Sequence, residues 1–204
     1  EMAHQLAIMA KALKRDMETA LCSKVAKNAG AAATVRQTGG FETWTETNVS
    51  RGTGGSGAGN GAAPVDGTAR AFSETILKAV QQLCFANGGE PSMLVVGPHV
   101  KAVVSGFSGR TSVTQTVDAN TVEASVAIYA GDFGELKVVP SNFSRARSAL
   151  FVDPNYAKTC FLRDFDTIDI ATIGDAITKM LVVEFGLEVS NEKAHGIAAD
   201  LSTS

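Results

Sequence analysis

Aromatic residues and cysteine are scarce in this chain of 204 residues, which has two tyrosines, one tryptophan and three cysteines. Cys22, Cys84 and Cys160 lie far apart and form no C-x-x-C pair, so we expect no disulfide framework and a reducing compartment. No apolar run reaches the roughly 18 residues that a membrane-spanning helix needs, so no membrane partner is expected. The formal net charge of −3 does not indicate a nucleic-acid-binding surface.

What the chain does have, first, is a long amphipathic segment. Apolar residues recur at steps of three and four from Met2 to Val25, which predicts one helix over Glu1–Ala29 with Gly30 after its end. Such a helix would be roughly 40 Å long and would lie across the molecule as a strut. Because the chain opens inside this helix, we expect it to be a fragment or a processed product.

The next segment changes character twice. Ala33–Ser50 is polar and rich in threonine, which predicts strand or irregular structure. Arg51–Pro64 consists mostly of glycine, alanine and serine, a composition typical of a flexible loop or linker. Asp66 is then expected to cap a second helix that ends at Gly88-Gly89. Its apolar face is expected to carry Phe72, Ile76, Val80 and Leu83.

Short elements follow this helix. Met93–Val96 is an uninterrupted apolar run and predicts a buried strand. Pro98 is well placed to open a third helix, Val100–Ser105, because its fixed φ suits the first helical turn. Gly106–Thr121 is polar without helical periodicity, which indicates an exposed loop.

The last third of the chain reads mainly as strands. Val126–Val139 predicts a hairpin with its turn at Asp132–Gly134, and Phe151–Leu162 predicts another around Asp153. Apolar and other residues alternate over Leu181–Val189, the period of a half-solvated antiparallel sheet. The change from a helical to a two-residue period predicts an α+β fold.

A glycine motif invites a phosphate-binding interpretation. Gly52, Gly54 and Gly57 satisfy G-x-G-x-x-G. A dinucleotide fingerprint must lie between a strand and a helix, whereas more glycine and then Pro64 follow here, and no lysine-serine pair closes the loop. We therefore expect a structural loop and no nucleotide cofactor.

Two groups of charged residues leave alternatives open. Asp164, Asp166 and Asp169 could gather as metal ligands or as an acid–base pair, but a solvated strand end explains the same spacing. Arg145 and Arg147 flank a turn and either are solvated or pair with acids on a neighbouring subunit. We expect no metal and no catalytic centre here.

The histidines do not indicate a catalytic or zinc site either. His4, His99 and His195 lack the spacing of zinc-binding helices, and His99 lies at a helix start where a capping role is expected. Cys160 could form a nucleophile triad with His99 and Asp153 in space, but its place in a strand predicts a buried, inert thiol.

Five ordered segments carry a resemblance to a known family. They are Met9–Leu21, Gly97–Lys101 with Ser105–Gly109, Asp132–Pro140, Arg147–Tyr156 and Leu187–Gly196. The series resembles the major capsid proteins of tailed bacteriophages typified by the podophage SU-ten, a branch of the Hong Kong 97-like capsid fold. The similarity runs nearly end to end and implies a structural shell subunit without catalytic residues or cofactors.

The resemblance also implies a division of the chain. Residues 1–62 would supply the spine helix and a strand segment of an antiparallel-sheet peripheral domain, and 145–204 would supply its second part. Residues 63–144 would form an axial domain of helices and sheet, which clusters in pentamers and hexamers. Family members carry an N-terminal arm and an extended hairpin before the spine helix. This chain begins at that helix, so we expect it alone to be mainly monomeric or weakly oligomeric.

The expected partners follow from the same resemblance. The chain would bind itself, would touch packaged DNA only non-specifically, and would belong to a virion assembled in the bacterial cytoplasm. Two rivals remain, a capsid-decorating or binding module and a hydrolase using Asp164, Asp166 and His99. The residues expected at subunit interfaces, besides Arg145 and Arg147, are Phe107, Arg110, Thr111, Gln115, Asp118 and Glu123.

Overall fold

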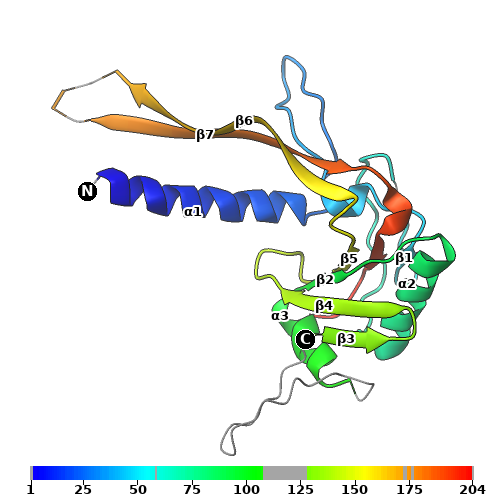
Figure 1. Ribbon diagram of the computed structural model, residues 1–204. Helices are drawn as coiled ribbons and strands as arrows, with labels where there is room; N and C mark the ends of the chain where they lie inside the picture. The colour runs from blue at the N-terminus through cyan, green and yellow to red at the C-terminus, as the bar shows by residue number, and fades with distance from the viewer. Residues whose placement is uncertain (1, 58, 108–127, 172–173, 176, 204) are drawn as a thin grey trace, which may run out of the picture.

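The computed structural model describes residues 2–57, 59–107, 128–171, 174–175 and 177–203. A body built on a six-stranded sheet carries a long projection made of one helix and a two-stranded ribbon (Figure 1). In chain order the elements are α1 (Met2–Leu21), η1 (Phe41–Thr43), β1 (Val49–Ser50), α2 (Glu74–Ala86), β2 (Met93–Val96), α3 (Pro98–Ser105), β3 (Ile128–Gly131), β4 (Gly134–Pro140), β5 (Ala149–Val152), β6 (Ala157–Ile170), β7 (Thr178–Val189), η2 (Glu192–Ala194) and β8 (Gly196–Ala198). From here on, α1, β6 and β7 together are called the arm, which is not the N-terminal arm that the family resemblance implies before the spine helix. The mixture of helix and strand confirms the predicted α+β class.

The body sheet is mixed in direction. Its strand order is β1-β8-β5-β2-β4-β3, with β1–β8 and β2–β4 parallel and the other pairs antiparallel. Because side chains alternate along a strand, β5 supplies both faces. Ala149 and Phe151 pack in the core beneath α2 and α3, whereas Leu150 packs on the opposite face with Phe41 and Ile197.

Several local predictions are confirmed. The strand at Met93–Val96 has the predicted bounds, and Pro98 lies in the first turn of α3. The hairpin around Asp132–Gly134 is present as β3 and β4, although Val126 and Ala127 lie outside the described residues. The loop expected over Gly106–Thr121 also falls largely outside them. These successes depend on signals carried by adjacent residues.

The first helix is shorter than predicted. It ends at Leu21, not Ala29, which makes it about 30 Å long. The backbone beyond it pairs with distant segments instead: Gly40 donates to the Val25 carbonyl at 3.0 Å, and Lys27 donates to the Gly61 carbonyl at 2.8 Å. Tertiary hydrogen bonds therefore replace the helical ones that the apolar period alone predicted. Within the described residues no helix is long and apolar enough to cross a membrane.

The predicted cap of the second helix is wrong. Ser73 caps α2, its hydroxyl accepting from the Ile76 N–H at 3.4 Å. Asp66 lies seven residues earlier and forms ion pairs with Lys24 and Arg145. The helix ends at Ala86, and Gly88 follows with φ of 79°, as the glycine signal predicted.

The glycine-rich segment is a loop, as its composition predicted, and hydrogen bonds hold parts of it in place. Backbone hydrogen bonds join Ser56 with Val65 and Gly55 with Gly52, and the Gly52 N–H donates to the buried Asp200 carboxylate at 3.0 Å. A Cβ on Gly52 would lie 2.0 Å from the Thr68 carbonyl oxygen. Glycine here permits close backbone packing, which composition alone cannot distinguish from flexibility.

The hairpin predicted over Phe151–Leu162 does not form. Its turn exists, because the Tyr156 N–H donates to the Asp153 carbonyl at 3.1 Å. However, β5 stays in the body sheet, while β6 pairs with β7 in the ribbon. The chain therefore passes from one sheet to another at this turn, and a turn signal cannot tell the two outcomes apart.

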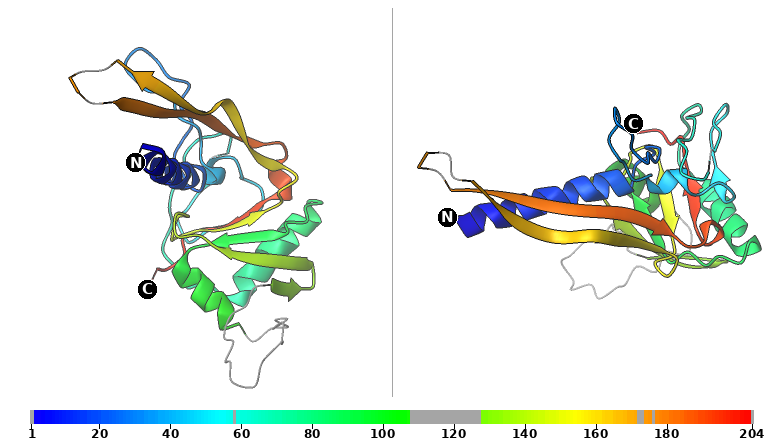
Figure 2. Two further views of the ribbon diagram at one scale, coloured as in Figure 1. Left: turned by 60° about the vertical axis from the view of Figure 1, so that its left-hand side comes forward. Right: turned by 90° about the horizontal axis from the view of Figure 1, so that it is seen from above.

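The ribbon and α1 extend in the same direction from the body and lie alongside each other, as the two further views agree (Figure 2). The alternation over Leu181–Val189 correctly predicts a strand, but none of the residues of β7 is fully buried. On α1 only Met17 is buried. The arm therefore has the apolar pattern of a packed structure, but most of its apolar side chains are not buried within one chain.

The packing of the glycine-rich segment can be tested with two matched substitutions. Gly52→Ala should lower the free energy of unfolding by about 2–4 kcal/mol because its methyl group meets backbone. Gly54→Ala, which has φ of +81° but nothing within 4 Å, should cost only about 1 kcal/mol. Urea unfolding followed by circular dichroism measures both. Equal costs would contradict the close packing.

Candidate functional site

The residues expected at subunit interfaces are dispersed. Arg110, Thr111, Gln115, Asp118 and Glu123 lie outside the described residues. Phe107 is half-buried against the body core, with its ring centroid 5.8 Å from that of Phe72. Its packing within the chain leaves only part of the side chain for a partner.

The two arginines already have partners within the chain. Arg145 lies 3.1 Å from the carboxylate of Glu42 and 2.6 Å from that of Asp66. Arg147 donates to the Gly67 carbonyl at 3.0 Å and lies 3.8 Å from Asp200. The expectation that Arg145 is solvated is wrong, because only 17% of its side chain is exposed. That the two arginines pair with acids on a neighbouring subunit stays a prediction. Within the chain, Glu42, Asp66 and Asp200 already lie within 4 Å of their guanidinium groups.

The ion pairs of Arg145 form an anchor for α1. Lys24, just beyond the helix, binds the same Asp66 oxygen at 2.6 Å, while Glu42 on η1 is fully buried. Burial alone would raise the pKa of Asp66, but hydrogen bonds from Lys24 and Arg145 outweigh it and hold that pKa below its ordinary value. Sequence patterns do not reveal this anchor, because its four charges are distant in the chain and form no motif.

The enzyme candidates do not assemble. Asp164 and Asp166 lie on β6 in the arm and accept from the adjacent backbone N–H groups, and Asp169 pairs with Lys179 at 2.8 Å. His99 belongs to α3 in the body, and Gly97, not His99, occupies the cap position. Among the described residues no three candidate ligands gather to hold a metal. The exposed positions of the three aspartates on β6 favour the solvated-strand interpretation.

The prediction of a buried Cys160 is wrong. Its thiol is exposed on the ribbon and donates to the Glu188 carboxylate at 3.0 Å, a bond that raises the pKa of the thiol. A raised pKa keeps the thiol protonated and makes it a poor nucleophile. The prediction of a strand at Cys160 is correct. The prediction of burial is wrong because the side chains of the ribbon are left largely exposed within one chain.

The arm exposes large apolar side chains. Leu162 on β6 is 76% exposed, and Ile177, the residue just before β7, is 74% exposed. Others that are more than a third exposed are, on the ribbon, Phe161, Ile168, Ile170 and Met180 and, on α1, Ile8 and Met9. A water-exposed structure gains nothing from so many apolar groups, so their number on the arm indicates a surface that another molecule covers.

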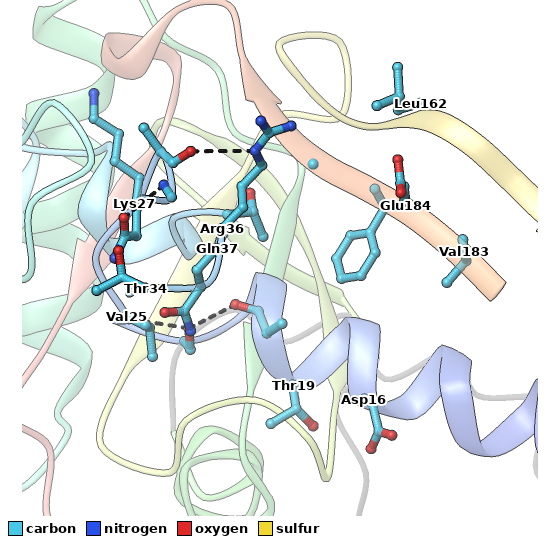
Figure 3. A pocket seen from close by; sticks show the side chains of 18 of the residues that line it. Asp16, Thr19, Val25, Lys27, Thr34, Arg36, Gln37, Leu162, Val183 and Glu184 are labelled. Carbon is cyan, nitrogen blue, oxygen red and sulfur yellow. Dashed lines mark hydrogen bonds between the residues drawn. The ribbon is translucent and has the colours of Figure 1, made fainter. Parts of the chain in front are cut away.

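A groove of about 1540 Å³ lies at the root of the arm (Figure 3). Its walls are the end of α1, the bridged segment 28–37 and four consecutive residues of β7, 183–186. Consecutive strand residues can line one wall only if the strand edge faces it. The Leu187 N–H indeed points away from β6 and donates to the Thr38 hydroxyl at 3.2 Å. Alternation directs the N–H groups of Phe185 and Val183 to this same edge.

Comparison with solved structures gives the class of fold. A chain of the holo-SrpI encapsulin complex from Synechococcus elongatus matches with a TM-score of 0.58 at 11% sequence identity. The match covers 100% of this chain and 67% of the encapsulin chain. A virus-like particle from Pyrococcus furiosus matches with a TM-score of 0.38 at 11% identity, covering 64% of this chain and 54% of that one. The first of these matches shows that the chain has the Hong Kong 97-like fold.

Comparison with family models gives the family. The model for the SU10 major capsid protein matches residues 1–202. No curated protein matches the chain. The chain belongs to the SU10 major capsid protein family, and it is a structural capsid subunit, not an enzyme. The resemblance drawn from the five sequence segments is confirmed, and the decorating-module and hydrolase alternatives are set aside.

The anchor predicts a pH-dependent stability. Asp66→Asn should lower the free energy of unfolding at pH 7 by about 1–2 kcal/mol, because the charge-assisted bonds are lost from a partly exposed site. A depressed folded-state pKa contributes stability above the unfolded value of about 3.9 and loses it as pH falls through the folded value. The difference between wild type and variant should therefore shrink as pH falls below about 3.9.

Chemical denaturation at pH 7 and pH 2.5 measures this difference. Asp164→Asn, a substitution on the exposed ribbon, is the matched control and should change stability by no more than about 0.5 kcal/mol. A loss for Asp66→Asn that is as large at pH 2.5 as at pH 7 would contradict the ionic origin of the effect.

Proposed function

We propose that this capsid subunit builds the icosahedral head shell of a tailed bacteriophage, and that the arm is the surface on which neighbouring copies bind. The observation that carries the proposal is the exposed apolar set on the ribbon and α1, in a chain whose family forms capsids. A second copy is the natural partner because a shell surrounds every subunit with copies of the same chain.

The energetics favour the arm over the charged surfaces. Burial of a leucine or isoleucine side chain stabilises by about 1.5–3 kcal/mol, whereas an exposed ion pair contributes about 0–1 kcal/mol. Exposed pairs on the ribbon such as Arg163–Glu184, at 3.6 Å, therefore act mainly in orientation and register. Apolar contacts such as those of Leu162 and Ile177 would supply the affinity.

The groove supports the same surface. An extended segment of a neighbouring copy could pair with the outer edge of β7 at Val183 and Phe185, because strand addition satisfies backbone groups that an edge strand leaves open. Lys27 and Arg36 on one wall and Asp16 and Glu184 on the others would give the incoming segment a direction. A two-stranded ribbon is marginally stable alone, so a third strand would stabilise it.

The division into a peripheral and an axial domain also belongs to this proposal. The arm comes from 1–62 and 145–204, and α2 with α3 comes from 63–144, which supports it. The body sheet nevertheless unites strands of all three ranges, since β2 pairs with β5 and β1 pairs with β8. The axial region with Phe107 would then face the centres of pentamers and hexamers.

The contents and the place of assembly complete the proposal. The shell encloses DNA, which it touches non-specifically, and it assembles in the cytoplasm of the bacterial host. A net charge of −3 supports weak, non-specific contact, because tight binding to DNA requires many phosphate-neutralising lysines or arginines.

Removing apolar surface from the arm tests the proposal. The double substitution Leu162→Ser with Ile177→Ser, made in the capsid protein as the phage produces it, should raise the concentration needed for shell assembly more than tenfold. Loss of about 1.5 kcal/mol or more at each subunit contact is sufficient for this change. Sedimentation velocity measures the fraction in particles, and thermal unfolding shows whether the subunit stays folded.

Val65→Ser is the matched control, since Val65 is 58% exposed but lies on the body, just after the glycine-rich segment. It should assemble as the wild type does. Normal assembly of the double variant, or equal defects in both proteins, would count against the arm as the contact surface.

A further inference from the structure

Both strands of the ribbon meet the body at one buried histidine. β6 begins after the turn that follows β5, and β7 ends in η2, which leads directly to His195 and β8. The Ser190 N–H donates to the Tyr156 carbonyl at 2.9 Å, which joins the two strands at this root. A change at His195 therefore acts where the ribbon joins the body.

The ring of His195 is held in one protonation state. The side chain is fully buried, and its ring packs edge-on against Phe41 with centroids 5.0 Å apart. Nδ1 accepts a hydrogen bond from the Asp153 backbone N–H at 3.2 Å. A nitrogen that accepts carries no hydrogen, so the ring is neutral with its proton on Nε2. Nε2 is buried and has no hydrogen-bond partner among the described residues.

A second proton would disrupt this arrangement. It would have to bind Nδ1, where the new N–H would face the N–H of Asp153, so that two donors point at each other and the bond is lost. The charge would also be buried. Burial lowers the pKa of His195, and the attraction of the Tyr156 backbone and of the carboxylates of Asp153 and Glu192 does not cancel this effect.

The other charged groups at the root are occupied. Asp153 accepts from the backbone and side-chain amides of Asn155 at 2.9 Å each. Glu192 accepts from the backbone N–H groups of Glu46 and Thr47 at 3.1 Å each. Glu42, next to Phe41 in the chain, is paired with Arg145. These three carboxylates therefore already have hydrogen-bond or ion-pair partners. His195 is the group whose hydrogen bond an added proton would break.

We propose that His195 is an acid-sensitive latch, which holds the root of the ribbon to the body at neutral pH and releases it when Nδ1 takes up one proton. Release breaks the Asp153–His195 hydrogen bond and lets the turn between β5 and β6 move away from η2. The ribbon then gains freedom relative to the body while the body core stays folded. The latch makes the angle of the arm responsive to pH, beyond its proposed role in shell contacts.

The pH window follows from the direction of the shift. The released state binds the proton with an ordinary histidine pKa of about 6.5, whereas the latched state has a lower pKa. The latched state is therefore favoured fully above pH about 6.5 and loses stability as pH falls from there toward the folded value. Uptake of one proton makes the release equilibrium rise by up to about tenfold per pH unit in this window.

Hydrogen exchange of the 204-residue chain between pH 7 and pH 5 tests the latch. The exchange rate of residues 178–189, divided by that of α2 residues 74–86 to remove the intrinsic effect of pH, should rise by up to about tenfold per pH unit. His195→Gln should abolish this rise, because the amide oxygen accepts from Asp153 at any pH. His99→Gln, on the surface of α3, is the control and should retain it.

Nuclear magnetic resonance of the histidine rings gives a second, independent readout on the wild type. Only three histidines are present, and the ring of His195 should carry its proton on Nε2 at pH 7. Its protonation should coincide with the rise in ribbon exchange. The proposal is overturned if His195→Gln shows the same rise as the wild type. Protonation of the ring without any change in ribbon exchange would overturn it as well.

Discussion

The guanidinium of Arg145, held between the carboxylates of Glu42 and Asp66, joins parts of the chain that would otherwise be independent. Glu42 is fully buried, and an unpaired charge in such a place costs about 3–5 kcal/mol, so the pairing constrains both neighbours. Through Asp66 the same group holds Lys24 at the end of α1. The helix is thus fixed at its root, which allows the rest of it to extend from the body without a core of its own.

This root gives the subunit two regions of different stability. The body has a core on each face of its sheet and should fold as an ordinary domain. The arm buries little, and a ribbon of two strands is marginal by itself in water. A structural capsid subunit with this division can fold before it meets its neighbours and complete the burial of its arm afterwards. Assembly then supplies free energy that folding of the single chain does not.

The sequence predicted the elements whose signals are local and missed those that depend on distant partners. Met93–Val96 and the Pro98 helix were correct because the apolar run and the proline act within a few residues. The end of α1, the role of Asp66 and the fold of the glycine-rich segment depend on contacts across the chain. Cys160 was expected to be buried because alternation reveals a strand but not whether its cover lies in the same molecule. The groove and the anchor have no local signal, whereas the family resemblance could be read directly from ordered segments.

The central claim is that the arm is completed by neighbouring copies. Hydrogen exchange of residues 157–170 and 178–189, compared between free subunits and assembled shells at one pH, tests it most directly. We expect the ribbon to exchange readily in the free subunit and at least about tenfold more slowly in the shell, while α2 changes little by comparison. Equal exchange of the ribbon in both states would contradict the account, because it would show that assembly leaves the arm uncovered.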